Sequence, residues 1–122
     1  MSSDFVHADL DLKNVTVHYV HIPVEKPRQI CVLVHGWPEF WFCWHKQMKA
    51  LAKAGIWAIA VDMRGFGDTR VLDKPDSVAS YTFDAQCGDM SRLLDHLGVS
   101  KAVFIGHDCE PSTSSQIGRA HV

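Results

Sequence analysis

The segment Lys101–Asp108 ends in a residue that could act as a nucleophile. It reads Lys-Ala-Val-Phe-Ile-Gly-His-Asp, so an apolar strand is followed directly by Gly106, His107 and Asp108. A strand that ends in such a turn is typical of the elbow that presents a nucleophile, with a carboxylate where a serine usually stands. A carboxylate is ionised at neutral pH and can attack an electrophilic carbon without an activating base. The pattern therefore predicts covalent catalysis by Asp108.

A second turn whose residues could take part in catalysis is His35–Glu39, which reads His-Gly-Trp-Pro-Glu. It follows the apolar run Ile30–Val34, and ligands of open α/β sheets bind beyond the carboxyl ends of such strands. We expect the turn to direct the backbone N–H of Trp37 at a developing oxyanion, because Pro38 restricts Trp37 to extended conformations. Taken alone, the segment is equally compatible with a simple strand-ending turn. Asp108, at the end of another strand, favours a site.

The hydrophobic pattern indicates which elements must position these residues. Two alternating segments predict an antiparallel hairpin, and short runs apolar on both faces predict buried parallel strands. The expected strands are Phe5–Leu12, Val15–Ile22, Ile30–Val34, Ile56–Val61 and Ala102–Ile105. The expected helices are one that starts at Trp41 and ends near Gly55, and one between an N-cap at Thr82 and a C-cap at Gly98. We therefore predict an α/β sheet with an antiparallel hairpin at its N-terminal edge and crossover helices between parallel strands.

Taken together, these motifs resemble the epoxide hydrolases of the α/β-hydrolase fold. The residues that carry the resemblance are His35–Glu39, Trp41, Trp44, Asp62–Gly67 and Phe104–Asp108. Each motif alone is loose, but their order and spacing together are specific. The resemblance covers nearly everything from the first strand to Asp108, and it implies the N-terminal part of an α/β-hydrolase sheet.

The resemblance also implies roles for individual residues. Asp108 would be the attacking carboxylate, with Trp37 supplying one oxyanion N–H and Cys109 the other. In that family the position of Cys109 is usually a tryptophan followed by two glycines, whereas here Cys109 and Glu110 stand there. The structural residues of the two motifs would be His35, Gly36, Pro38, Gly106 and His107.

The activity implied by the resemblance is conversion of an apolar epoxide and water to a vicinal diol through an aspartyl ester, without a cofactor. Hydrolysis of the ester needs a histidine and a second acid, which follow the nucleophile in this fold. After Asp108 only His121 and Glu110 are available, and neither lies in a recognisable strand-loop context. The family takes its proton donors from tyrosines of a helical lid. We therefore expect this chain to be inactive alone.

We expect residues 1–108 to form a partial α/β-hydrolase domain and residues 109–122 to be an aberrant tail. The segment Gln116–Val122 can be encoded by codons that, from the second base, spell the start of a common DNA-sequencing adapter. Segments of this kind are excluded from fold reasoning. Comparison with the genomic sequence tests this expectation.

Charge and composition exclude several classes of partner. The net charge is −2 and no basic stretch could neutralise phosphates, so we expect no nucleic acid. No apolar run approaches the roughly 20 residues of a membrane span, and no signal peptide is recognisable, so we expect a cytoplasmic protein.

The four cysteines include no C-x-x-C pair, which favours reduced thiols. His18 and His21 should point to opposite faces of a strand, and we predict no metal site. The oligomeric state stays open.

Two alternatives remain open at this point. A haloalkane or haloacid dehalogenase also uses an aspartate at the elbow, although Glu39, Trp41 and Trp44 favour the epoxide enzymes. Tyrosine acids in a lid would indicate epoxide opening, and halide-binding Trp or Asn residues would indicate dehalogenation. The other alternative is a short non-catalytic protein that binds a partner with a half-sheet, which predicts a stop codon after Val122.

Overall fold

The computed structural model describes residues 5–36, 39–73 and 77–106, which form a mixed six-stranded sheet flanked by helices. The strands are β1 (Val6–Leu12), β2 (Val15–His21), β3 (Gln29–Val34), β4 (Ile56–Val61), β5 (Arg70–Val71) and β6 (Val103–Gly106). The helices are α1 (His45–Lys53) and α2 (Phe83–Leu97), with single 3-10 turns η1 (Trp41–Trp44) and η2 (Val78–Tyr81). The strand order is β1-β2-β4-β3-β6, and β5 pairs with β2. The predicted α/β architecture is confirmed.

The hairpin β1–β2 forms the N-terminal edge of the sheet, as predicted. Its register pairs Val6 with His21 and Leu12 with Val15, and Lys13 occupies the turn with a positive φ of 29°. β2 then pairs antiparallel with β4. The hairpin therefore closes one side of the parallel part of the sheet.

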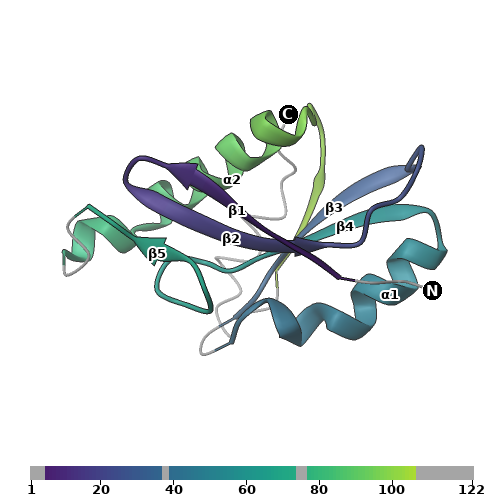
Figure 1. Cartoon of the computed structure of the whole chain (residues 1–122), viewed down its shortest axis with the longest axis horizontal. Coiled ribbons are helices and arrows are strands. Elements are labelled where there is room, and N and C mark those ends of the chain that lie inside the picture. The colour runs from purple at the N-terminus through teal and green to yellow at the C-terminus, as the bar shows by residue number, and fades with distance from the viewer. Residues whose placement is uncertain (1–4, 37–38, 74–76, 107–122) are drawn as a thin grey trace.

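The parallel strands are covered on both faces, which explains their continuous apolar sequences. Figure 1 shows α1 and α2 on opposite sides of the sheet. One core cluster joins the α2 side to the sheet through Val32, Val34, Ile59, Val61, Met90, Leu93, Leu94 and Phe104. The other joins the η1–α1 side to it through Cys31, Leu33, Trp41, Trp44, Met48, Ala58 and Ala60. Alternate residues of β3 and β4 thus face alternate sides.

The ends of α2 follow the sequence prediction. The Thr82 hydroxyl accepts a hydrogen bond from the Ala85 N–H at 3.2 Å, so Thr82 caps the first turn. Gly98 has a φ of 72°, and the Val99 N–H donates to the Leu94 carbonyl at 2.9 Å, which ends the helix.

The first helix and the loop after β4 differ from the prediction. The segment from Trp41 starts as a 3-10 turn, whose first N–H is bound to the Asp62 carboxylate, and the α-helix begins only at His45. The segment between β4 and α2, for which the sequence predicts no strand or helix, contains β5 and η2. Arg70–Val71 pairs with Val15–Thr16 of β2, and a two-residue strand is too short to show a periodicity. In the described part of the chain, no helix is long and apolar enough to cross a bilayer.

Candidate active site

The carboxyl ends of β3 and β6 lie side by side. The two strands are parallel, and Val34 is paired with Gly106. The turn that begins with His35 and Gly36 therefore leaves the sheet beside the end of β6. These are the positions at which α/β proteins bind ligands. Several predicted site residues lie outside the described residues, namely Trp37, Pro38, His107, Asp108 and Cys109.

His35 is buried and both of its ring nitrogens are occupied. Its Nδ1–H donates to the Gly36 carbonyl at 2.9 Å, and its Nε2 accepts the Met63 N–H at 2.9 Å. The ring also packs edge-on against the Phe66 ring, with 5.1 Å between the ring centroids. A carbonyl can only accept and an amide N–H can only donate, so these contacts require the neutral tautomer with its hydrogen on Nδ1. His35 therefore has no free nitrogen for proton transfer.

The turn after His35 is closed by reciprocal hydrogen bonds between Gly36 and Glu39. The Glu39 N–H donates to the Gly36 carbonyl at 2.9 Å, and the Gly36 N–H donates to the Glu39 carboxylate at 3.1 Å. The Gly36 N–H is thus already bound within the turn. An oxyanion donor in this turn must come from another residue.

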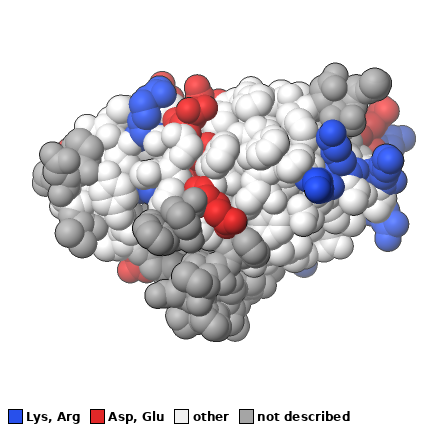
Figure 2. All heavy atoms as spheres, turned by 90° about the horizontal axis from the view of Figure 1, so that it is seen from below, with Lys and Arg blue, Asp and Glu red and all other residues white. Residues whose placement is uncertain are grey.

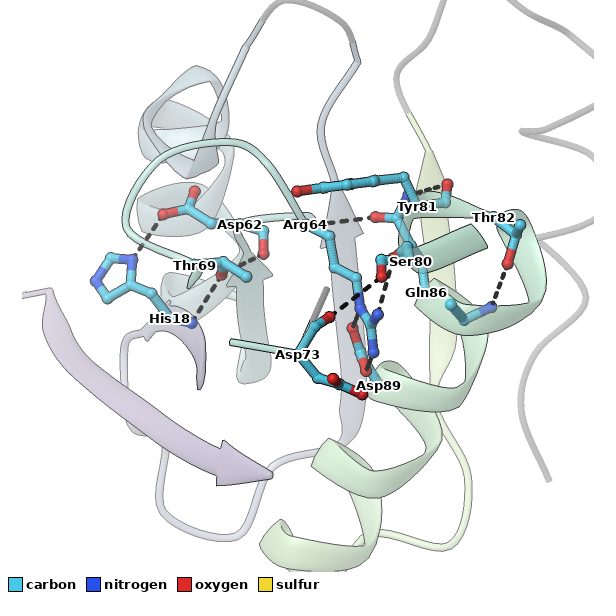
Figure 3. A network of polar contacts seen from close by, with 11 residues as sticks. His18, Asp62, Arg64, Thr69, Asp73, Ser80, Tyr81, Thr82, Gln86 and Asp89 are labelled. Carbon is cyan, nitrogen blue, oxygen red and sulfur yellow. Dashed lines mark hydrogen bonds and ion pairs between the residues drawn. The ribbon is translucent and has the colours of Figure 1, made fainter. Parts of the chain in front are cut away.

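Asp62, the residue after β4, is the centre of a buried polar network. Its carboxylate accepts the Trp41 N–H at 2.7 Å, the His18 Nδ1–H at 2.7 Å and the Asp68 N–H at 3.0 Å. Its carbonyl accepts the Thr69 hydroxyl at 2.6 Å, and that hydroxyl accepts the His18 N–H at 2.8 Å. Figure 3 shows Asp62, His18 and Thr69 grouped together on one side of the network. One carboxylate therefore connects β2, η1 and the glycine-rich loop after β4.

A second buried carboxylate holds the same loop from the α2 side. Asp89 accepts the Nε–H and an Nη2–H of Arg64 at 2.7 and 2.8 Å, and the Arg64 Nη1 donates to the Ser80 carbonyl at 2.8 Å (Figure 3). The hydrogen bond with Asp89 raises the pKa of Arg64. The Arg64 N–H also donates to the Gln86 side chain at 3.1 Å. Arg64 therefore anchors the glycine-rich loop to α2 and η2.

The cysteines of the described part are free thiols. Burial raises the pKa of Cys31 and of Cys87, the latter with a contribution from Asp84. Burial, with the nearby charges of Glu39 and Asp62, raises the pKa of Cys43 to about 11. None of these three thiols is a candidate nucleophile at neutral pH, because the thiolate is the reactive form. Within residues 5–36, 39–73 and 77–106, no group of three or more His, Cys, Asp or Glu could hold a metal ion.

The structure unites part of the predicted site and reveals residues that sequence reasoning missed. His35, Gly36 and Gly106 meet at one edge of the sheet, as the order of strands and turns implied. The role of Asp62 was missed, although it lies within a recognised motif, because its partner His18 is 44 residues away in the sequence. The only available signal was a charged residue directly after a fully apolar strand. His18 and His21 differ as predicted, since His18 is buried against Asp62 while His21 accepts the Trp57 Nε1–H at 2.9 Å.

Comparison with known families adds independent information. The profile of the alpha/beta hydrolase fold family matches residues 31–109, which include both predicted turns and, apart from His18, the polar network described above.

Curated relatives and solved structures agree on a narrower group. The chain is 37% identical over 107 residues to the bifunctional epoxide hydrolase 2 of Mus musculus, and the matched segment covers 87% of this chain and 18% of the relative. It is 46% identical over 77 residues to epoxide hydrolase 2 of Siraitia grosvenorii, covering 63% of this chain and 23% of the relative. The crystal structure of epoxide hydrolase A from Mycobacterium thermoresistibile superposes with a TM-score of 0.77 at 31% identity, covering 90% of this chain and 33% of that one. The chain therefore spans only about a fifth to a third of the relatives it matches.

Proposed function

Since this chain belongs to the alpha/beta hydrolase fold family, we propose that it is part of an epoxide hydrolase, which adds water to an epoxide to give a vicinal diol. The observation that carries this proposal is the parallel pairing of β3 with β6. This pairing brings His35 and Gly36 beside Gly106 at one edge of the sheet. The relatives of the chain are named epoxide hydrolases.

The proposed reaction has two covalent steps. In the first, the Asp108 carboxylate attacks an epoxide carbon, the ring C–O bond breaks, and the ring oxygen takes a proton from an acid elsewhere in the full-length protein. In the second, water attacks the carbonyl carbon of the resulting ester, and the bond between that carbon and the alkyl oxygen breaks. The diol leaves and the carboxylate is restored, so no cofactor is consumed.

The second step forms a tetrahedral oxyanion, for which we propose the backbone N–H groups of Trp37 and Cys109 as donors. Removing one such donor typically costs roughly 3 kcal/mol of transition-state stabilisation. The histidine that activates water and the acid that orients it belong to the remainder of the full-length protein. We propose residues 1–108 as the partial hydrolase domain and residues 109–122 as an aberrant tail, of which only the Cys109 backbone N–H takes part in catalysis.

We further propose a small apolar epoxide as substrate and a cytoplasmic location. The surface supports a small-molecule partner over a polyanion. Figure 2 shows that the basic side chains on this face form a cluster at the right and a smaller group at the upper left, separated by acidic and uncharged residues. On this face, the described residues therefore form no continuous basic track for a phosphate backbone.

A single-turnover experiment in oxygen-18 water tests the proposal in the full-length protein that contains this sequence. Because the diol takes one oxygen from Asp108, the first product should lack the label, and the peptide containing Asp108 should gain it. Asp108→Asn should abolish covalent adduct formation, whereas the exposed Asp95→Asn should leave it unchanged. A labelled first product and an unlabelled peptide would falsify the covalent mechanism.

A further inference from the structure

Asp62 holds the start of η1 in place. The Trp41 N–H, two residues after the His35–Glu39 turn, donates to the Asp62 Oδ1 at 2.7 Å. This carboxylate is only 2% exposed, so water does not compete for it. A charge-assisted hydrogen bond of this length in a buried setting is among the stronger ones in proteins.

The next residue in sequence holds the other end of the same turn. The Met63 N–H donates to the His35 Nε2 at 2.9 Å, and the His35 Nδ1–H donates to the Gly36 carbonyl at 2.9 Å. Two consecutive residues at the end of β4, Asp62 and Met63, are therefore bound to the two flanks of the turn. The position of the turn depends directly on where these two residues lie.

Asp62 is itself fixed by groups unrelated to the turn. The His18 Nδ1 and the Asp68 N–H occupy its Oδ2 at 2.7 and 3.0 Å, and Gly67 approaches so closely that an added Cβ would collide with the carboxylate. The carboxylate thus has one available orientation. It transmits the position of β2 and of the glycine-rich loop to the start of η1.

We propose that Asp62 is a positioning residue for the oxyanion donor, and that it acts on ester hydrolysis much more than on ester formation. This inference rests on the proposed function, since it assumes that the turn held by Asp62 supplies the oxyanion N–H. The two steps differ in where charge develops. Attack on the epoxide places new charge on the ring oxygen, whereas hydrolysis places it on the carbonyl oxygen that the turn would stabilise.

The test is Asp62→Asn in the full-length protein, followed by rapid mixing with excess epoxide. Asparagine has the same shape but puts an NH₂ group where one set of donors now binds, so at least one contact of Asp62 is lost. Displacing a positioned group by about 1 Å typically lowers the reaction rate by about a hundredfold. We expect hydrolysis to slow roughly tenfold to a hundredfold while ester formation stays within a factor of about three, so that the covalent enzyme accumulates.

The matched control is Asp89→Asn. Asp89 is also a buried carboxylate bound to the loop after β4, but its hydrogen bonds go to Arg64 and not to His35, Gly36 or Glu39, the described residues of the turn. We expect this variant to lose stability without changing the ratio of the two rates. Equal slowing of both steps in Asp62→Asn, or the same change of ratio in Asp89→Asn, overturns the inference. Absence of any adduct in the unmodified protein would instead overturn the proposed function.

A milder pair of variants keeps the test valid if Asp62→Asn does not fold. His18→Asn retains an N–H donor near the Nδ1 position, whereas His18→Leu has a similar size and no donor. We expect His18→Leu to slow ester hydrolysis selectively, by about threefold to tenfold, and His18→Asn to restore the ratio of the two rates. Identical ratios in the two variants would count against the role of Asp62.

Discussion

Two buried carboxylates support the loop after β4 in different ways. Asp89 is paired with one opposite charge, the Arg64 guanidinium, through two hydrogen bonds. Within the described part of the chain, the Asp62 carboxylate is bound by the His18 ring and by two backbone N–H groups, those of Trp41 and Asp68. Asp89 therefore fixes one side chain, whereas Asp62 fixes the relative position of three chain segments. The comparison indicates that the first carboxylate serves mainly stability and the second mainly geometry.

The largest effect that tests this comparison is expected at Arg64. Arg64→Met leaves Asp89 buried without its partner, which typically costs about 3–5 kcal/mol of unfolding free energy. The double variant Arg64→Met with Asp89→Leu removes both charges and should recover most of that loss, apart from about 1 kcal/mol for the hydrogen bond to the Ser80 carbonyl. Urea unfolding of the full-length protein measures both values. A double variant as unstable as the single one would show that packing, not charge pairing, is the contribution of this pair.

The anchoring role of Arg64 could be predicted from the sequence, whereas the role of Asp62 could not. A single arginine beside a glycine-rich turn, without a cradle of N–H groups for a phosphate, favours an anchoring role. The strands β3 and β4 were equally accessible, because continuous apolar runs such as Ile56–Val61 occur where both faces of a sheet are covered. Thr82 and Gly98 marked the ends of α2 through local chemistry alone.

The features that sequence reasoning missed depend on contacts between distant segments. The Trp41 N–H, at the start of η1, bonds to Asp62, 21 residues later. β5 exists because Arg70–Val71 meets β2, more than 50 residues earlier in the chain. No local pattern encodes such pairings. For the same reason, the sequence identified the two turns of the site but not the carboxylate that connects one of them to β4.

A smaller effect is expected from two glycines with positive φ. Gly98→Ala places a Cβ in open space and should cost roughly 1–2 kcal/mol of backbone strain. Gly67→Ala incurs the same strain, and its Cβ also collides with the Asp62 carboxylate, which adds about 1–3 kcal/mol for overpacking. Thermal or urea unfolding measures the difference. Equal losses in the two variants would mean that Asp62 can move freely, which contradicts a fixed carboxylate.

The smallest effect concerns the Cys43 thiol, which reports the charges around the site. Its pKa is about 11, raised from 9.0 first by burial and then by Glu39 and Asp62. The folded state therefore holds the thiol proton more tightly than the unfolded state does. The resulting contribution to stability is complete below pH 9 and is lost as the pH rises towards 11.

Iodoacetamide alkylation of a variant whose only cysteine is Cys43 measures this pKa as the inflection of the pH–rate profile. Removing a negative neighbour favours the thiolate and lowers the pKa. We expect Glu39→Gln to lower it more than Asp62→Asn, because Glu39 makes the larger contribution, and Asp89→Asn to leave it unchanged. A shift in Asp89→Asn equal to that in Asp62→Asn would mean that the two carboxylates share one electrostatic environment. The separation between a stabilising pair and a positioning carboxylate would then lose its physical basis.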